Sequence, residues 1–284
     1  MPLITRFDPW HSSLCTCPPK LTMNPYTGCD HNCVYCYASS YIPRFNRCRP
    51  KKDLLKRLVN EARKLRGETV SLSNSSDPYP SMEAELELTR GCLKTLNTSH
   101  CRIQIITKST LVQRDSDLLK NTVSMVAITI TTLNEETAKL LEPNAPSPTA
   151  RLKTIETLSN HDIPVAARID PIIPGINDDT HKLIEILASI GVKHVTCSTY
   201  KAKTDNWRRF ANAMPNAAGK LKPFYFENGE RLDRSAALPK HLRLRILSGA
   251  RSEAEKHNVR FGVCREGLGQ LNTASCDGSW LLKR

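Results

Sequence analysis

The sequence lacks the features of a membrane-inserted or exported chain. Its 284 residues contain no run of eighteen apolar residues, about the length that a membrane-spanning helix needs. The first residues lack the basic and then apolar layout of a signal peptide, which predicts a cytoplasmic protein without a membrane partner. Internal repeats and low-complexity tracts are also missing. At this length, a single α/β barrel domain with one core is the default expectation.

Acidic residues are scarce toward both ends of the chain, where the net charge of +13 is concentrated. Residues 1–66 hold twelve Lys or Arg against four Asp or Glu, and residues 201–265 hold fifteen against six, whereas residues 67–200 are slightly acidic. Because Lys and Arg contacts with phosphate supply most non-specific affinity for nucleic acid, this distribution favours a polyanionic partner. A basic surface that contacts only solvent is the alternative.

The eleven cysteines are an odd number, and in such a chain they favour metal ligation over disulfides. Three have the spacing Cys29-x3-Cys33-x2-Cys36, within the segment Asn24-Pro-Tyr-Thr-Gly-Cys-Asp-His-Asn-Cys-Val-Tyr-Cys-Tyr37. Three thiolates leave one iron of a 4Fe–4S cluster without a protein ligand, and such an open position can bind and activate a small molecule. Three unrelated buried thiols or a structural zinc knuckle are the alternatives, but zinc sites usually present a second Cys or His pair, and His31 is poorly placed for a fourth ligand.

Short β-rich runs alternate with helical patterns, which predicts repeated βα units and a parallel sheet. The expected strands are Leu21–Tyr26, Thr69–Ser73, Arg102–Thr107, Val123–Thr129, Val165–Ile169 and His194–Cys197. The expected helices are Lys52–Leu65, Glu83–Leu96, Ser116–Lys120, Thr149–Asn160 and Thr180–Ile190. Six such strands would form an open, partial (β/α)6 barrel, in which ligands bind at the carboxyl ends of the strands. The cysteine motif follows the first strand and is therefore expected at that rim.

Beyond Tyr200 the alternation of strands and helices stops. Pro and Gly punctuate a stretch that is expected to be irregular, and one more helix, Lys240–Lys256, follows it. These patterns divide the chain into an N-terminal segment (1–20), a barrel (21–200) and a C-terminal extension (201–284). The extension is expected to close the open side of the barrel.

The cysteine spacing, with Tyr35 directly before Cys36, resembles that of the radical S-adenosylmethionine (SAM) superfamily. Other segments resemble its spore-photoproduct-lyase branch, in the order Cys33-Val-Tyr-Cys-Tyr37, Ser76-Asp-Pro-Tyr79, Ile106-Thr-Lys-Ser109, Leu141-Glu-Pro-Asn144 and Pro171-Ile-Ile-Pro-Gly-Ile-Asn-Asp178. The resemblance spans residues 21 to about 200. It implies a radical SAM barrel with a 4Fe–4S cluster, reduced by a donor such as ferredoxin or flavodoxin. Reduction would cleave SAM to a 5′-deoxyadenosyl radical that abstracts hydrogen from a substrate.

The resemblance also implies roles for individual residues. The cluster would be held by Cys29, Cys33 and Cys36. Ser76 and Lys108 would hold the carboxylate end of SAM, a charge-assisted contact for the lysine. The ribose would contact Thr129 and Thr131, and adenine would approach the backbone at Ile172 and Gly175. The plainer alternatives are a surface lysine, β-branched strand residues and a stiff turn. The pocket is expected to be lined by Asp77, Tyr79 and Arg168, with capping of the following turn as the alternative for Asp77.

One departure from this branch concerns the return of a hydrogen atom to the product radical. Spore photoproduct lyases use a cysteine near the end of the second strand for this step. Asn74 occupies the matching position, and because its side chain has no easily abstracted hydrogen, lyase activity on thymine dimers is not expected. Tyr35 and Tyr37 match tyrosines that can relay a hydrogen atom, and packing at the rim is the alternative for both.

A second departure is a set of extra cysteines near the two ends of the chain, namely Cys15, Cys17, Cys264 and Cys276. Four thiols in Gly- or Pro-rich loops suit an auxiliary 4Fe–4S cluster, or a structural zinc, that would join the ends of the open barrel. Unpaired buried thiols are the alternative. The remaining cysteines are expected to be small core residues: Cys48, Cys92, Cys101 and Cys197.

Two basic clusters flank the expected site. The first follows the cysteine motif and contains Arg44, Arg47, Arg49, Lys51 and Lys52. The second interleaves Lys201, Lys203, Arg208 and Arg209 with Trp207 and Phe210. Basic residues mixed with aromatics suit a clamp on a nucleic-acid backbone with base stacking. An amphipathic helix that packs Trp207 on the barrel is the alternative for the second cluster.

The leading hypothesis is a radical SAM enzyme that acts on nucleic acid, either in the repair of DNA lesions or in tRNA modification. A radical SAM enzyme that modifies a peptide or protein is the first alternative, since an acidic substrate segment would also explain the charge. The second alternative is a non-catalytic iron–sulfur or zinc protein that binds nucleic acid. Cleavage of SAM separates both enzymes from this last class.

Overall fold

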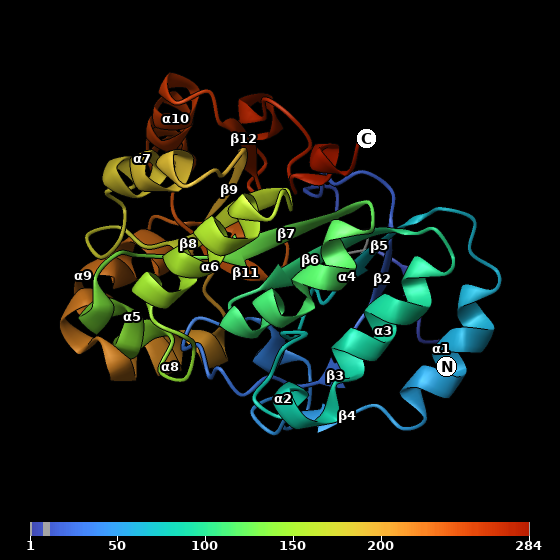
Figure 1. Cartoon of the computed structure of the whole chain (residues 1–284). Helices are drawn as coiled ribbons and strands as arrows, with labels where there is room; N and C mark the ends of the chain where they lie inside the picture. The colour runs from blue at the N-terminus through green and yellow to red at the C-terminus, as the bar shows by residue number, and fades with distance from the viewer. Residues whose placement is uncertain (1, 8–11, 284) are drawn as a thin grey trace.

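The computed structural model describes residues 2–7 and 12–283, and its centre is a sheet with strand order β1-β2-β5-β6-β7-β8-β9-β12 (Figure 1). Neighbouring strands from β2 to β9 pair in parallel. They are β2 (Leu21–Met23), β5 (Thr69–Leu72), β6 (Arg102–Thr107), β7 (Ser124–Thr129), β8 (Val165–Ile172) and β9 (His194–Thr199). Each lies within or overlaps a strand expected from the sequence, so the predicted α/β partial barrel is confirmed.

Short strands complete the β-structure. At one edge, β1 (Thr5–Arg6) pairs antiparallel with β2, and at the other β12 (Arg260–Val263) pairs parallel with β9. Two small antiparallel pairs lie outside this sheet: β3 (Tyr26–Thr27) with β4 (Arg49–Pro50), and β10 (Glu230–Leu232) with β11 (Ser235–Ala237). The sequence pattern did not indicate these strands, because two to four residues are too few to show a period.

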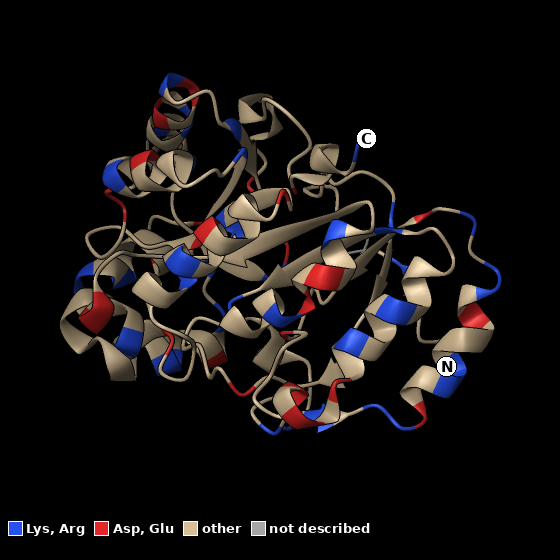
Figure 2. Cartoon of the chain, viewed as in Figure 1, with Lys and Arg blue, Asp and Glu red and all other residues tan. Residues whose placement is uncertain are grey.

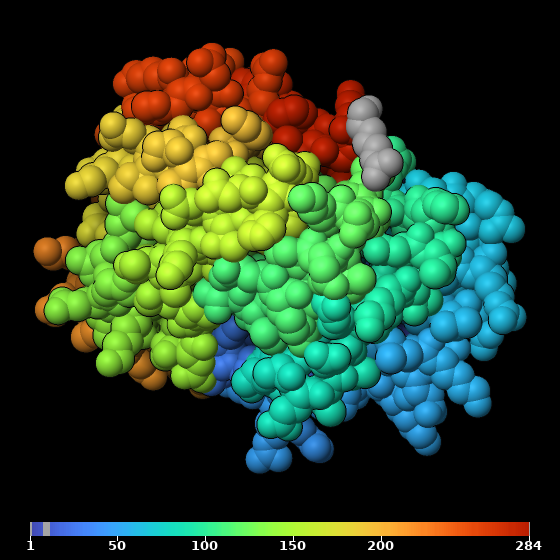
Figure 3. Space-filling model, viewed as in Figure 1, coloured from blue at the N-terminus to red at the C-terminus, as the bar shows by residue number. Residues whose placement is uncertain are grey.

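Helices connect the parallel strands and cover the outer face of the sheet (Figures 1 and 3). They are α1 (Leu54–Ala62), α2 (Glu83–Leu86), α3 (Leu88–Asn97), α4 (Ser116–Lys120), α5 (Glu135–Leu141), α6 (Pro148–Asn160) and α7 (His181–Ser189). The predicted helix Glu83–Leu96 is divided at Glu87, whose φ of +48° interrupts helical geometry. Helix α5 was not predicted. Its N-cap is Asn134, whose side chain accepts a hydrogen bond from the backbone N–H of Thr137.

The two faces of the sheet differ in polarity. Apolar strand residues such as Val70, Ile103 and Val126 are fully buried in the main core, together with the inward faces of the helices. Because successive strand residues point to opposite faces, the residues between them line the other side of the sheet. These include Ser71, Gln104 and Arg168. This second, more polar face also carries the apolar residues Met125, Ala127 and Ala166.

The C-terminal extension is more regular than expected. It contains α8 (Thr204–Ala213), which was expected only as the alternative for the second basic cluster, α9 (Pro215–Phe226), which was not predicted, and α10 (Lys240–Lys256), which was. The expectation of an irregular stretch fails at α9 because Pro215 stands at the start of the helix, where its missing N–H costs nothing. Among the described residues, no helix is both long and apolar enough to cross a membrane.

The end of the chain packs across the polar face of the sheet. The Asp277 carboxylate pairs with Lys20, just before β2, and the Asp277 carbonyl accepts a hydrogen bond of 2.9 Å from Gln104 in β6. On the other side, the indole N–H of Trp280 donates to His194 in β9 over 3.1 Å. These contacts support the expectation that the extension closes the open side of the barrel. The three-part division of the chain remains a prediction.

Candidate active site

The cysteine motif forms a loop between β3 and the short 3-10 helix η1 (Ala38–Ser40), and separate parts of the chain hold it. The backbone N–H of Cys29 donates to the carbonyl of Phe45 over 2.9 Å. The N–H of Val34 donates to the carbonyl of Leu141 over 2.9 Å. Arg209 of α8 donates to the carbonyl of Cys36 over 2.7 Å. The loop is therefore fixed between the barrel and the C-terminal extension.

The three thiols of this loop form a donor set suited to an iron–sulfur cluster. Cys29 is buried, and Cys33 and Cys36 are half-buried. Burial raises the pKa of the Cys33 thiol to about 12, and the nearby Lys108 ammonium opposes this rise. Burial also raises the pKa of Cys29 and Cys36. A bound metal ion removes the proton from a coordinating thiol, so the three soft ligands fit the group. As the described side chains stand, no group of three His, Cys, Asp or Glu is gathered closely enough to hold a metal ion.

A buried ionic network lies beside the cysteine loop, and Glu142 is its centre. Its carboxylate accepts hydrogen bonds from the Tyr35 hydroxyl and from Arg151, and from the Thr131 hydroxyl over 3.2 Å. The Lys108 ammonium lies 4.0 Å from the same carboxylate. Burial opposes ionisation of Glu142, but the charges of Arg151 and Lys108 hold its pKa below the ordinary value. The segment Leu141–Asn144 was noted in the sequence, yet it gave no sign that Glu142 would organise the site.

Lys108 is placed where the resemblance implies a contact with SAM. Its ammonium lies 5.5 Å from the centre of the Tyr35 ring, close to the cysteine loop. Burial lowers the pKa of Lys108, but Cys33 and Glu142 outweigh that effect and raise it. The lysine is therefore a half-buried cation beside the loop and not the ordinary surface lysine that was its alternative.

The turn after β5 contains Asp77 and Tyr79, which were expected to line the pocket. Asp77 accepts hydrogen bonds from the Thr107 hydroxyl over 2.6 Å and from the Lys108 backbone N–H over 2.8 Å, and it caps the turn at Tyr79 N. The hydroxyl of Tyr79 is buried and donates to Asp115. Asp77 therefore caps the turn, as its alternative held, and the expectation that Asp77 and Tyr79 line the pocket remains a prediction. Ser76 is buried, and its hydroxyl donates to the Tyr26 carbonyl over 3.2 Å.

The residues expected to contact ribose and adenine lie at the ends of β7 and β8. Thr129 and Thr131 are buried, and the Thr129 carbonyl accepts a hydrogen bond from Arg151 over 2.9 Å. The carbonyl of Ile172 accepts one from Tyr200 N–H over 2.9 Å. Gly175 has a φ of +70°, and a side chain built there would meet nothing within 4 Å. Gly175 is thus the position in this group with open space beside its backbone. The roles of all four in binding SAM remain predictions.

The two tyrosines of the motif differ in their surroundings. The hydroxyl of Tyr35 is engaged by Glu142, whereas Tyr37 is exposed and its hydroxyl donates to the carbonyl of Asn74 over 2.8 Å. The side chain of Asn74 is itself fixed, because its amide donates to the Thr22 hydroxyl over 2.7 Å. Of the two predicted relay residues, Tyr37 is the one whose ring reaches the surface of the site.

The four terminal cysteines are only partly brought together. The sulfur of Cys276 lies 3.4 Å from that of Cys17, and Cys17 is close enough to Cys15 to raise the pKa of the Cys15 thiol. Cys264, which follows β12, instead lies near the Arg168 guanidinium and raises its pKa, and Arg168 also pairs with Asp170 over 2.7 Å. The expectation that Arg168 lines the pocket remains a prediction. Of the cysteines expected to lie in the core, Cys92, Cys101 and Cys197 are buried there and Cys48 is half-buried.

The two basic clusters have different structures. Trp207 packs against Tyr200, Phe210, Tyr225 and Phe226, with ring centroids 4.8–6.3 Å apart, so the second cluster is the amphipathic helix that was its alternative. The first cluster remains at the surface, between the cysteine loop and α1 (Figure 2). Within it, the Arg49 guanidinium is tied to the carbonyls of Pro43 and Arg47.

Comparison with known proteins agrees with this architecture. An uncharacterized protein of Methanocaldococcus jannaschii is 34% identical over 165 residues, which are 56% of this chain and 62% of the relative. The chain thus matches less than two thirds of that relative's length. A spore photoproduct lyase mutant with bound AdoMet and dinucleoside spore photoproduct has a similar fold, with a TM-score of 0.66 and 17% identity over 86% of this chain and 75% of that one. Streptococcus suis SuiB bound to S-adenosylmethionine gives a TM-score of 0.58 and 12% identity over 85% of this chain and 49% of that one. Residues 23–196 match the Radical SAM superfamily, which covers well over half of the sequence, and the chain therefore belongs to that superfamily.

Proposed function

We propose that this radical SAM enzyme acts on nucleic acid, in the repair of a DNA lesion or in tRNA modification. The observation that carries the proposal is the basic segment, residues 44–52, which directly continues the cysteine loop at the surface. The bound dinucleoside of the similar spore photoproduct lyase structure supports the same substrate class. The positive charges of this segment would attract a substrate that carries phosphates.

In this proposal, Cys29, Cys33 and Cys36 hold the 4Fe–4S cluster and Lys108 orients SAM. The cluster and SAM together supply a 5′-deoxyadenosyl radical once an electron arrives from a donor such as ferredoxin or flavodoxin. Glu142 holds Tyr35 and keeps Lys108 charged, so that the ammonium can face the SAM carboxylate. Ser76, Thr129, Thr131, Ile172 and Gly175 complete the proposed SAM site.

We assign the predicted relay of a hydrogen atom to Tyr37 alone. Its ring is exposed, and its hydroxyl donates to a backbone carbonyl and not to a buried carboxylate. Loss of a hydrogen atom from Tyr37 therefore leaves no buried charge without its hydrogen-bond donor. The Tyr35 hydroxyl donates a hydrogen bond to the buried Glu142 carboxylate, and in this proposal the contact holds the two residues in place. Since Asn74 replaces the lyase cysteine, the proposed reaction is not the reversal of thymine dimers.

The auxiliary metal site is proposed with a narrower set of ligands than the sequence suggested. Cys17 lies 3.4 Å from Cys276 and close to Cys15, and after a movement of their side chains these three thiols would hold a second cluster or a zinc ion between the two ends of the chain. Cys264 lies near Arg168 instead and is not included among the proposed metal ligands.

The experiment that tests the function is the formation of 5′-deoxyadenosine by anaerobically reconstituted, dithionite-reduced protein. We expect the wild type to form the product and Cys33→Ala to form none. Cys101→Ala removes a buried thiol outside the cysteine loop and should retain activity. DNA, tRNA and protein fractions are then added in turn, and we expect nucleic acid to raise the yield. Stimulation by protein alone would support a peptide-modifying enzyme, and a protein that binds SAM without ever cleaving it would contradict the proposed catalysis.

A further inference from the structure

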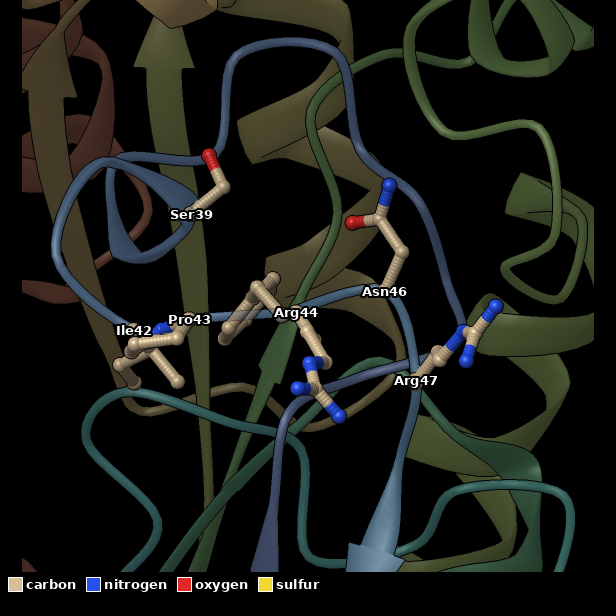
Figure 4. A pocket seen from close by; sticks show the side chains of 7 residues that line it. Ser39, Ile42, Pro43, Arg44, Asn46 and Arg47 are labelled. Atoms are coloured by element: carbon tan, nitrogen blue, oxygen red, sulfur yellow. The ribbon is translucent and has the colours of Figure 1, made fainter.

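The segment that follows the cysteine loop forms a pocket of about 570 Å³ at the surface (Figure 4). It is lined by Ser39, Ile42, Pro43, Arg44, Phe45, Asn46 and Arg47. Figure 4 shows Arg44, Asn46 and Arg47 extending from one short stretch of chain, with Ser39 on the neighbouring helical turn. The pocket therefore belongs to a single loop, and its walls carry two guanidinium groups and an amide.

This loop is fixed to the cysteine motif. The Cys29 N–H donates to the Phe45 carbonyl over 2.9 Å, and the Cys48 thiol donates to the Gly28 carbonyl over 3.6 Å. Gly28 has a φ of +84°, and a side chain there would lie 2.4 Å from the Phe45 carbonyl oxygen, so only glycine allows this close approach. A ligand held in the pocket would consequently keep a set position relative to Cys29.

The charges of the pocket are not neutralised within the chain. Among the residues that the structure describes, the side chains of Arg44 and Arg47 have neither an ion pair nor a hydrogen bond, and both are exposed. The buried arginines behave differently, since Arg151 and Arg243 each pair with a glutamate. Arg49 does not compete for a ligand, because its guanidinium binds backbone carbonyls and shapes the loop. Two cations thus remain for an external anion.

Two exposed aromatic residues, Tyr37 and Tyr41, lie in the segment that joins the cysteine loop to the pocket-lining residues. The rings of Tyr37 and Tyr41 stack with their centroids 6.1 Å apart and an interplanar angle of 27°, and both side chains are among the exposed large apolar groups of the chain. Exposed aromatic rings next to cations are the combination that binds single-stranded or unstacked nucleotides, since the cations contact phosphate and the rings stack on bases.

We propose that Arg44 and Arg47 bind the phosphodiester backbone of a single-stranded or extruded nucleotide segment, while a base stacks on Tyr41. This inference rests on the proposed nucleic-acid substrate and specifies how it is held. Tyr41 directly precedes Ile42 of the pocket lining and stacks on Tyr37, so a base stacked on Tyr41 would lie next to the residue assigned to hydrogen transfer. An acidic peptide would use the two cations but would gain nothing from the tyrosine stack.

The test is the binding of fluorescein-labelled single-stranded DNA and RNA of one sequence to the full-length, cluster-reconstituted protein, followed by fluorescence anisotropy at several salt concentrations. Without reductant, SAM is not cleaved, so the outcome is independent of catalysis. The slope of log Kd against log salt should fall by about 1.4 in Arg44→Gln/Arg47→Gln, because each lost phosphate contact on a single strand removes about 0.7. Arg44→Lys/Arg47→Lys should keep most of the slope.

Tyr41→Ala should weaken binding by about 5- to 150-fold without changing the slope, whereas Tyr41→Phe should bind like the wild type. The control is Arg245→Ala on α10, an exposed arginine at the opposite end of the molecule from β4 (Figure 1), which should change neither quantity. An unchanged slope in the double Gln variant would overturn the assignment of the arginines. Binding of poly-glutamate but not of either oligonucleotide, with loss in the same variant, would show a peptide site and overturn the substrate class.

Discussion

The hydroxyl of Tyr35 donates a hydrogen bond to the carboxylate of Glu142 across 107 positions of sequence, and this contact joins the cysteine loop to the end of α5. Glu142 is 2% exposed, and it also binds Arg151, a guanidinium that is 1% exposed. A buried ion pair with additional hydrogen bonds fixes geometry more than it adds stability. The contact therefore acts mainly to orient Tyr35 and the lysine beside it.

Glu142→Gln should destabilise the protein by about 3–5 kcal/mol, because it leaves the buried Arg151 cation without a counter-charge. The measurement is urea-induced unfolding followed by circular dichroism. Glu136→Gln, an exposed residue of α5, is the matched control and should change the free energy of unfolding by less than about 0.5 kcal/mol. Equal stability of the two variants would show that Glu142 is not the centre of the network.

The two tyrosines of the cysteine loop should separate by function. Tyr35→Phe leaves a buried carboxylate short of one donor and should cost about 1–3 kcal/mol of stability. Tyr37→Phe removes a hydrogen bond at an exposed site, so its cost should stay below about 1 kcal/mol. The proposed relay predicts that Tyr37→Phe still forms 5′-deoxyadenosine but yields less modified substrate per SAM cleaved. Coupled yields equal to wild type in this variant would remove Tyr37 from the reaction.

Lys108→Met should weaken SAM binding, because it removes a half-buried cation that is proposed to face the SAM carboxylate. Charge-assisted hydrogen bonds contribute about 1.5–3 kcal/mol, so the dissociation constant should rise by at least about tenfold. Anaerobic titration calorimetry with reconstituted protein measures the change. Lys94→Met, in the last turn of α3, serves as the control and should bind SAM like the wild type. An unchanged affinity in Lys108→Met would show that the ammonium does not bind SAM and serves only as a partner of Glu142.

Much of the fold was predictable because the buried strands carry a clear pattern. β6 and α4 have the bounds expected from the sequence, and α10 does as well. The errors have two different causes. The break between α2 and α3 falls on Glu87, a residue type that gives no sign of a positive φ. β12 is four residues long and is defined by its pairing with β9, a contact between distant parts of the chain.

The site could be predicted only where its residues lie close together in the sequence. Three cysteines within eight positions identify the loop, whereas the partners of Tyr35 and Lys108 come from a segment more than thirty residues further along. Asp77 was expected in the pocket because polar residues after a strand often line one. Its carboxylate is used by Thr107 and by the Lys108 backbone, which are brought to it by the parallel pairing of β5 and β6.

Iron content should distinguish the proposed metal ligands Cys15, Cys17 and Cys276 from Cys264, which is not proposed as a ligand. If Cys15, Cys17 and Cys276 hold an auxiliary 4Fe–4S cluster, reconstituted wild type should contain about eight irons per chain and Cys17→Ser about four. Cys264→Ser should keep the wild-type content, because Cys264 contacts Arg168. Zinc in place of the extra iron would indicate a structural site. Four irons and no zinc in the wild type would contradict a second metal site altogether.

The pair Lys20–Asp277 should make stability depend on acid pH. Burial opposes ionisation of Asp277, but Lys20 lowers its pKa to about 2, against about 3.9 in an unfolded chain. A group whose pKa is lower in the folded state stabilises the fold above its unfolded pKa. That contribution, about 2–3 kcal/mol, is lost as the pH falls from about 5 toward 2. The C-terminal segment that covers the polar face of the sheet should therefore detach first in acid.

Asp277→Asn removes this dependence and leaves Lys20 buried without a counter-charge, so at pH 7 the variant should be less stable than wild type by about 3 kcal/mol or more. As the wild-type carboxylate takes up its proton, the difference should shrink, because both chains then carry a neutral group opposite the lysine. Urea unfolding at pH 7, 5, 4 and 3 measures it. Asp162→Asn, at an exposed turn whose positive φ suits Asn, is the control and should track the wild type at every pH. A gap between Asp277→Asn and wild type that stays constant over this range would show that the pair does not lower the pKa of Asp277.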